Sequence, residues 1–264
     1  MYSMKCFIGV CVLLCSVLSP VYAHDMLYTD WEILLKTCVQ DGDINYSLLK
    51  ENESLLYTFI NTIALVSYEH YQTFSDKEKL AFWINTHNAF SLSLVLKNPL
   101  AESFKDVDNG PQGKFFTVFG RTVSLNDVKH TYIRSRFHDE RIHFALAAPA
   151  RGFPQVRNEA YLDAYLDLLL EDDVVRFIIR EENVQINHEE KKIYLSKLFK
   201  WFGVDFIKRY GIRSGMLQKF SASERAVLNF LGSHLKDQKK FIMSGDFTIV
   251  YRDFDWTMNR GGKQ

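Results

Sequence analysis

Polar side chains interrupt a long apolar stretch of the chain, which runs from residue 80 to residue 96. Asn85, Asn88 and Ser91 recur there at intervals of three, and His87 lies beside them. Residues three apart share one face of a helix, and a buried amide without a partner costs about 1 to 3 kcal/mol. These side chains therefore either hydrogen-bond to the backbone of a neighbouring loop or form one wall of a binding cleft.

His130 is the second candidate for chemistry. It follows Ser124-Leu-Asn-Asp127, a pattern that predicts the start of a helix, so Asp127 and Arg134 should lie about one turn before and after it. An imidazole between a carboxylate and a guanidinium can act as an oriented acid or base. It can equally serve as a structural hydrogen-bond donor, and the sequence leaves both roles open.

Arginines gather in a third region, between residues 134 and 157. Guanidinium groups bind carboxylate and phosphate through paired hydrogen bonds, so this region indicates a site for an anionic ligand. Asp139, Glu140 and Glu159 lie in the same region, and a solvated face of local ion pairs is the alternative. The basic residues of the region are Arg134, Arg136, His138, Arg141, His143, Arg151 and Arg157.

His143 differs from the other basic residues because it lies inside an apolar run, Ile142-His-Phe-Ala-Leu146. The run has the length of a strand and leads into a loop over residues 149–154. A titratable residue where a strand enters a tight loop is a good candidate for a functional site. We therefore take His130 and His143 as candidate catalytic residues. The candidate binding residues are Asn85, His87, Asn88, Arg134, Arg151 and Arg157.

Familiar catalytic signatures are absent from the sequence. It contains no Gly-x-Ser-x-Gly elbow, no Gly-x-Gly-x-x-Gly after a strand, no Walker-type phosphate loop and no His-Glu-x-x-His. These absences argue against nucleotide-dependent chemistry and against the commonest hydrolases. The histidines and cysteines lack the spacing of metal ligands, and we predict neither a metal nor another cofactor.

The elements that must position these residues are mostly helices. Apolar periodicity predicts helices near residues 27–40, 53–66, 75–96, 124–133, 159–179, 197–209, 214–219 and 222–236. Short hairpins are expected at 115–123 and 184–195, and a late strand at 247–251. The pattern predicts an α+β fold, with residues 24–264 in a single compact domain dominated by helices with short antiparallel hairpins.

Composition is that of an ordinary globular protein. The chain has 264 residues, of which 47% are hydrophobic, and its 32 basic residues equal its 32 acidic residues. Without a net charge there is no overall field that would attract nucleic acid or an anionic membrane. We therefore expect no nucleic-acid partner; a small anionic ligand or another protein remains as the partner class.

Residues 1–23 have the pattern of a secretory signal peptide. Lys5 precedes an apolar run from Cys6 to Leu18, and small or branched residues precede the expected cleavage after Ala23. The run is shorter than the roughly 20 residues of a membrane helix, so we predict no membrane span and export to the periplasm or the medium. Cys38 then remains as the last cysteine, and we expect a small buried side chain rather than a reactive thiol.

Several ordered segments together resemble the bacterial and plant domain of unknown function 547 family (DUF547). The resemblance extends from about residue 31 to residue 259. The matching segments are Leu80-Ala-Phe-Trp-Ile-Asn-Thr-His-Asn-Ala89, Ser124-Leu-Asn-Asp-Val-Lys-His130, Arg141-Ile-His-Phe-Ala-Leu146, Pro154 with Arg157-Asn-Glu-Ala-Tyr161, Tyr194-Leu-Ser-Lys-Leu-Phe-Lys-Trp201 with Asp205-Phe206, and Phe254-Asp-Trp-Thr-Met-Asn259.

The resemblance implies an α+β domain, often exported in bacteria, with a suspected site built from the Asn-x-x-Asn helix, two histidines and a loop that carries cysteines. Asn85, Asn88, His130 and His143 match that pattern, whereas His87 stands where the family usually has tyrosine. The loop departs further. The family usually reads Cys-Ala-Ser-x-Gly-Cys-Pro, and this chain reads Ala148-Pro-Ala-Arg-Gly-Phe153-Pro154.

Neither a methyl group nor a phenyl ring can replace a thiolate as a nucleophile, metal ligand or redox group. We therefore expect a degenerate, non-thiol member of the family that acts as a binding or regulatory module. A hydrolase is the alternative, with His130 or His143 as general base and arginines that hold an anionic substrate. A third interpretation is a structural protein that binds another chain through an aromatic surface.

Overall fold

Helix α6 (Asp76–Lys97) lies at the centre of the N-terminal part of the molecule. It begins at the predicted capping box, in which the Ser75 hydroxyl accepts from the backbone of Glu78 and the Glu78 carboxylate accepts from the backbone of Ser75. Every residue from Leu80 to Val95 is buried, as expected for a helix that is apolar nearly all round.

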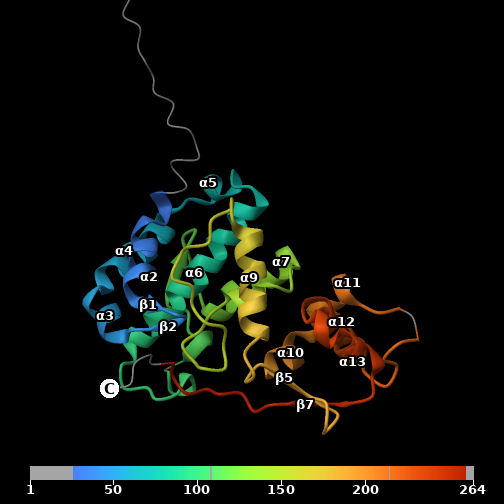
Figure 1. Cartoon of the computed structure of the whole chain (residues 1–264). Helices are drawn as coiled ribbons and strands as arrows, with labels where there is room; N and C mark the ends of the chain where they lie inside the picture. Colours follow the sequence, from blue (N-terminus) through green and yellow to red (C-terminus); the bar gives the residue numbers. More distant parts are fainter. Residues whose placement is uncertain (1–25, 108, 214, 260–264) are drawn as a thin grey trace, which may run out of the picture.

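The structure is a computed structural model that describes residues 26–259 apart from residues 108 and 214. The expected signal peptide at residues 1–23 lies outside the described residues. The described chain forms two lobes, each around its own hydrophobic cluster (Figure 1). We define the N-terminal lobe as residues 26–170 and the C-terminal lobe as residues 174–251.

The N-terminal lobe is helical apart from two small antiparallel strand pairs, β1–β2 and β3–β4. Its elements are α2 (Thr29–Cys38), β1 (Val39–Gln40), β2 (Asp43–Ile44), α3 (Tyr46–Glu51), α4 (Glu53–Leu65), α5 (Tyr68–Gln72), α6, η1 (Phe104–Asp106), η2 (Gly110–Gln112), β3 (Phe116–Val118), β4 (Arg121–Val123), η3 (Asp127–Arg134), α7 (Ser135–Phe137) and α8 (Ile142–Ala145).

The C-terminal lobe packs helices against a three-stranded sheet in the order β5-β6-β7, in which β5 and β6 form the predicted hairpin and β7 runs parallel to β6. Its elements are β5 (Val184–Asn187), β6 (Lys192–Leu195), α10 (Lys197–Phe202), η4 (Gly203–Phe206), α11 (Ile207–Tyr210), α12 (Ala222–His234), η5 (Lys236–Gln238), α13 (Lys239–Ser244) and β7 (Thr248–Tyr251). The predicted α+β class with short antiparallel pairs is confirmed. No described helix is both long and apolar enough to cross a bilayer.

Helix α9 (Leu166–Ile178) and the side chain of Phe144 join the two lobes. Figure 1 shows α9 in yellow between the lobes, and its residues contribute to both hydrophobic clusters. Phe144 projects from α8 into the C-terminal cluster, where its ring stacks on Phe230 at 5.7 Å between centroids and contacts Phe177 and Phe199. The lobes therefore share apolar packing rather than a flexible linker.

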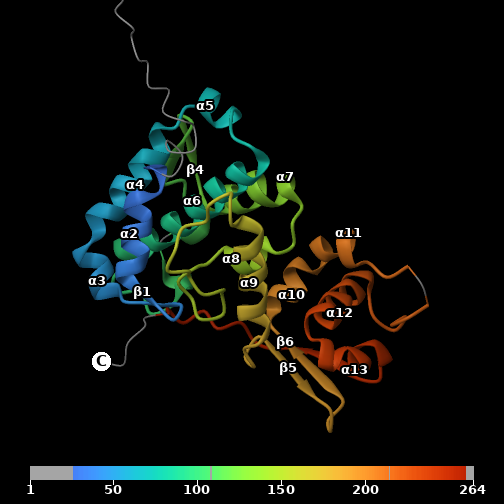
Figure 2. The same ribbon diagram turned by 45° about the horizontal axis from the view of Figure 1, so that its top comes forward.

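The chain then returns from β7 to the N-terminal lobe as an extended segment, residues 252–259, which we call the C-terminal strap (Figures 1 and 2). On one side the Phe104 amide donates to the Trp256 carbonyl, and on the other the Gly152 amide donates to the Asp255 carbonyl at 2.8 Å. A Cβ atom on Gly152 would lie 2.9 Å from that carbonyl oxygen. The close approach of the strap therefore requires glycine at position 152.

Several predicted elements differ from the structure. Residues 142–145 form the short helix α8, not a strand, because an apolar run of this length is compatible with either.

The helix expected from residue 159 begins only at Leu166, since Glu32 and Asn85 accept hydrogen bonds from the backbone amides of Ala160 and Tyr161 and hold this segment as a turn. The helix expected at 197–209 is broken at Gly203, and residues 215–219 form turns.

Replacement of Phe144 by alanine should lower the free energy of unfolding by about 3 to 5 kcal/mol, because it opens a cavity where the lobes meet. Urea unfolding followed by circular dichroism measures the change. Leu168→Ala on α9 is the matched control, since Leu168 is 70% exposed. Equal losses in the two variants would mean that Phe144 does not couple the lobes.

Candidate functional site

The segment that carries His130 is a π-helix, η3, rather than the α-helix that the sequence predicts. It also carries Lys129 and Arg134. Long π-helical segments are rare, and π-helical turns occur frequently at functional sites. The Asp127 carboxylate, expected beside His130, instead accepts from the Ser124 backbone amide at the start of the segment, at 2.9 Å.

The carboxylate that organises this site is Asp205, from η4 in the other lobe. Arg134 donates to it through Nε at 2.7 Å and through Nη2 at 2.9 Å. His143 donates to the same carboxylate through Nε2 at 2.7 Å. Burial alone would raise the pKa of Asp205, but the hydrogen bonds from His143 and Arg134 outweigh it and hold the pKa well below its usual range.

Arg134 also fixes the proton of His130. The guanidinium has only donors, so the contact of 3.0 Å between Arg134 Nη1 and His130 Nδ1 makes Nδ1 the acceptor. Partial burial, Lys129 and Arg134 lower the pKa of His130. The neutral imidazole therefore carries its proton on Nε2, where it can donate a hydrogen bond.

His143 is buried and has the same tautomer. Burial lowers its pKa to about 4, although the hydrogen bond to Asp205 opposes this effect. With the proton on Nε2, the Nδ1 atom retains a lone pair. Nδ1 is buried and has no hydrogen-bond partner among the described residues. The two histidines are thus connected through Arg134 and Asp205, and no direct hydrogen bond joins them among the described residues.

Phe202, the last residue of α10, packs across this network. Its ring stacks on the imidazole of His143 with 4.2 Å between centroids and an angle of 10°. Lys129 Nζ lies 4.4 Å from the centre of the ring, and Arg134 Cζ lies 5.0 Å from it. Two cationic groups therefore contact one phenyl ring.

Phe202 also lines a pocket of about 290 Å³, which we call the aromatic pocket. Ala148 and Phe153, where the family resemblance led us to expect cysteines, both line it. Most of its lining is apolar, and its polar groups include Lys129, His130 and His87. The lining residues are His87, Phe104, Pro111, Gln112, Leu125, Asn126, Lys129, His130, Leu146, Ala148, Phe153, Trp201, Phe202 and Trp256.

The amides of the α6 stripe bind backbone rather than the pocket. Asn85 accepts from Trp31 Nε1 and from the Tyr161 amide, and donates to the Tyr161 carbonyl at 2.8 Å. Asn88 donates to the Ala145 carbonyl and accepts from the Ala147 amide, both at 3.0 Å. Both side chains therefore hold neighbouring loops in place, which is the first of the two roles that the sequence left open.

His87 donates through Nδ1 to the Asn88 side-chain oxygen, 3.2 Å away. Burial, together with the charge of Lys129, lowers the pKa of His87 to about 3. It is a neutral group that lines the aromatic pocket and is oriented by Asn88.

The arginines do not converge on one anion site. The guanidinium of Arg157, buried beneath α9, pairs with Asp173 at 2.8 Å, Asp172 at 2.6 Å and Glu159 at 2.7 Å. Arg134 is bound to Asp205. Local ion pairs, the alternative that the sequence allowed, thus occupy both of these guanidinium groups.

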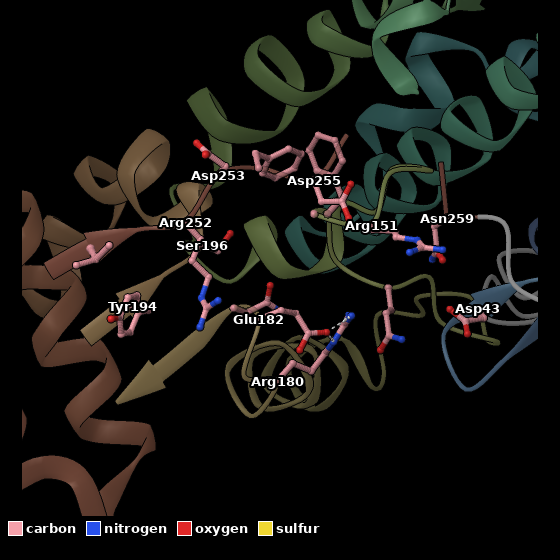
Figure 3. A pocket seen from close by; sticks show the side chains of 16 residues that line it. Asp43, Arg151, Arg180, Glu182, Tyr194, Ser196, Arg252, Asp253, Asp255 and Asn259 are labelled. Atoms are coloured by element: carbon pink, nitrogen blue, oxygen red, sulfur yellow. Dashed lines mark hydrogen bonds and ion pairs between the residues drawn. The ribbon is translucent and has the colours of Figure 1, made fainter. Parts of the chain in front are cut away.

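Arg151 lines a second and larger pocket of about 940 Å³, and Phe153 lines both this pocket and the aromatic pocket. Figure 3 shows Arg252 and Tyr194 on one side of it, Arg151 and Asn259 on the other, and the Arg180–Glu182 ion pair between them. Acidic and basic side chains alternate around this pocket, so it does not favour an anion over a cation.

Three residues of the site, Lys129, Phe202 and Asp205, were not identified as site residues from the sequence. Asp205 lies 71 positions from Arg134 and 62 from His143, so no local spacing reveals it. Two positions in the sequence could have indicated them. Lys129 directly precedes the candidate His130, and Phe202 directly follows Trp201, which ends a segment that carries the family resemblance. Cys38 is buried as predicted, and burial raises the pKa of its thiol to about 11.

The described part of the chain contains no group of three or more histidine, cysteine or acidic side chains arranged to hold a metal ion. The arrangement offers an apolar cavity with hydrogen-bond donors on Lys129 and on His130 Nε2. Such a cavity suits an apolar ligand that carries an acceptor or a negative charge.

Comparison with known proteins supports the family resemblance over part of the chain. Residues 71–178 match the DUF547 family, described as proteins of unknown function. The matched segment runs from α5 through α9 and contains α6, the π-helix, α8 and the loop with Ala148 and Phe153. Neither a curated protein nor a solved structure matches the chain.

The two buried histidines should make stability depend on pH. An unfolded histidine has a pKa near 6.5, whereas burial holds His87 near 3 and His143 near 4. Between those values the unfolded chain binds more protons, so the free energy of unfolding should fall as the pH falls from about 6.5 to 4.5. Each histidine should contribute up to about 1.4 kcal/mol per pH unit.

Urea unfolding at several pH values, compared with a His87→Gln/His143→Gln variant, isolates this contribution because the other titrating groups are common to both proteins. The double variant should show a flatter pH dependence in this window. Parallel curves would contradict the neutral, buried state of these imidazoles.

Proposed function

We propose that this chain, which resembles the DUF547 family over residues 71–178, is a binding protein. Its aromatic pocket would hold a small ligand with an apolar body and an anionic group. The pocket volume of about 290 Å³ corresponds to a compact ligand such as an aryl acid.

One observation carries the proposal: Lys129 and His130 line the same pocket as the side chains of five aromatic residues. Aromatic walls favour an apolar body, because its transfer from water is favourable. The ammonium group of Lys129 and the Nε2 proton of His130 supply donors for a negative group. The ligand would thus be oriented with its charge toward the π-helix.

Thiol chemistry is not part of the proposal. Ala148 and Phe153, at positions where the family resemblance implies cysteines, line the pocket, and the buried thiol of Cys38 has a raised pKa. Phe153 packs its ring against Phe254 at 4.8 Å and Trp256 at 5.9 Å, between the loop and the strap. It supports the wall of a binding pocket.

The tautomers of the histidines favour binding over hydrolysis. A general base needs an available lone pair, and the Nδ1 lone pair of His130 already accepts from Arg134. The free Nδ1 of His143 is buried, and its ring lies against Phe202. His143 itself does not line the aromatic pocket. Neither of the two histidines that the hydrolase alternative invokes as general base therefore offers a free lone pair in this pocket.

The fluorescent aryl sulfonate 8-anilinonaphthalene-1-sulfonate is a suitable probe, because it joins an aromatic body to a fixed negative charge. We expect saturable binding with increased fluorescence. Lys129→Met should weaken binding about tenfold or more, because it removes a charge-assisted interaction worth about 1.5 to 3 kcal/mol. Ala148→Leu should weaken it by filling the pocket.

Arg180→Met in the larger pocket is the matched control and should leave the affinity unchanged. The uncharged analogue N-phenyl-1-naphthylamine should bind to the unsubstituted protein more weakly than the sulfonate does. Its affinity for Lys129→Met should equal its affinity for the unsubstituted protein. If Lys129→Met bound the sulfonate with full affinity, the proposed anchoring of the negative group would be wrong.

We further propose that the protein is exported to the periplasm or the medium. The support is the sequence of residues 1–23, with Lys5, the apolar run and Ala23 before the expected cleavage. Export would remove three of the four cysteines and leave Cys38 alone.

Mass spectrometry of the protein after expression with its full leader in a bacterial host tests this proposal. The mature chain in the periplasmic or culture fraction should begin at His24. Ala23→Leu should slow processing, because the peptidase site requires a small residue there. A full-length chain retained in the cytoplasm would contradict the proposal.

A further inference from the structure

Lys129 combines two neighbouring aromatic rings with a position in the lining of the aromatic pocket. Its Nζ lies 4.4 Å from the centre of Phe202 and 5.8 Å from the centre of Phe153. Among the described residues, no carboxylate lies within 4.0 Å of it. The side chain nevertheless lines the aromatic pocket, so a ligand in the pocket would lie beside the amine.

The charged and titratable groups around Lys129 come from several elements. Arg134 shares its π-helix, Asp205 lies in η4, and the neutral imidazoles of His87, His130 and His143 lie nearby. Burial lowers the pKa of Lys129 to about 8; Arg134 acts in the same direction and Asp205 opposes it. Desolvation and a neighbouring cation are the two conditions that make a lysine amine nucleophilic near neutral pH.

We propose that Lys129 is a nucleophile that captures aromatic aldehydes in the aromatic pocket as an imine. The inference rests on the proposed function, because the aldehyde must first occupy this pocket. It adds a reversible covalent bond and a defined chemical class of ligand, an aryl carbonyl compound with a negative substituent.

The reaction needs no co-reactant. The lone pair of Nζ attacks the carbonyl carbon, and the oxygen takes a proton to give a carbinolamine. The carbon–oxygen bond then breaks, water leaves with a second proton, and a carbon–nitrogen double bond forms. One amine and one aldehyde give one imine and one water, and addition of water reverses the reaction.

The geometry favours an aromatic rather than an aliphatic aldehyde. Phe202 and Phe153 lie beside the amine, and Trp201 and Trp256 form further walls of the same pocket. A flat ring can pack against these side chains while its carbonyl carbon approaches Nζ. A negative substituent can accept from His130 Nε2, which carries the proton that Arg134 directs there.

The test uses 4-carboxybenzaldehyde with sodium cyanoborohydride, which reduces an imine to a stable secondary amine. We expect one adduct per chain, mapped by peptide mass spectrometry to Lys129. Lys129→Arg should abolish it while circular dichroism and the melting temperature verify the fold. Lys105→Arg is the matched control, because Lys105 Nζ lies 5.1 Å from the Trp256 ring but is exposed.

The rate at Lys129 should exceed that at Lys105 by at least about tenfold at pH 7.5, because burial lowers the pKa of Lys129 to about 8 and Lys105 does not line the pocket that would hold the aldehyde. Labelling spread over surface lysines, or absent from Lys129, would overturn the inference. Terephthalate, which lacks the aldehyde, separates the two proposals by displacement of the fluorescent sulfonate. If terephthalate displaced the sulfonate but the aldehyde gave no adduct, only imine formation would be refuted. If the sulfonate did not bind and no displacement occurred, the proposed function would be refuted as well.

Discussion

The hydrogen bonds to the carboxylate of Asp205 determine the chemistry of the whole site. They bring Arg134 and His143, from the N-terminal lobe, to a residue of the C-terminal lobe. Because a carboxylate accepts and a guanidinium donates, this one group fixes the proton of His143 directly and that of His130 through Arg134. One of the two candidate histidines, His143, thereby becomes a buried ring, and the other, His130, becomes an exposed donor.

This constraint also explains why the pocket is built from both lobes. The same interaction places Phe202 over His143 and beside Lys129. The strap places Trp256 against Phe153, with 5.9 Å between the ring centroids. Separation of the lobes would remove Trp201 and Phe202 from the pocket. It would at the same time break the hydrogen bonds of Arg134 and His143 to Asp205. Pocket shape and histidine chemistry are therefore coupled through one interface, which Phe144 reinforces with apolar packing.

Local sequence signals predicted the elements but not their long-range partners. The capping box at Ser75 and the two hairpins depend on residues a few positions apart, and these features were predicted. Residues 142–145 were predicted as a strand because their apolar run has no periodicity that separates a strand from a buried helix. Asp127 was the expected partner of His130 because it is near in sequence, whereas the actual carboxylate is Asp205. The aromatic pocket combines residues from 87 to 256, so periodicity within one element could not reveal it.

The loop that carries Ala148 and Phe153 is held without thiols, because other atoms fix its backbone. Asn88 binds the backbone at Ala145 and Ala147, before the first cysteine position. Gly152, one position before Phe153, donates a backbone hydrogen bond to Asp255 of the strap. Neither contact involves a side chain at position 148 or 153, so substitution there changes the chemistry of the pocket while its backbone framework is kept. Ala148 and Phe153 both line the pocket, and the ring of Phe153 forms an aromatic wall near Lys129. With Ala148 and Phe153 in its lining, the pocket supports the proposed recognition of an apolar ligand beside the amine of Lys129.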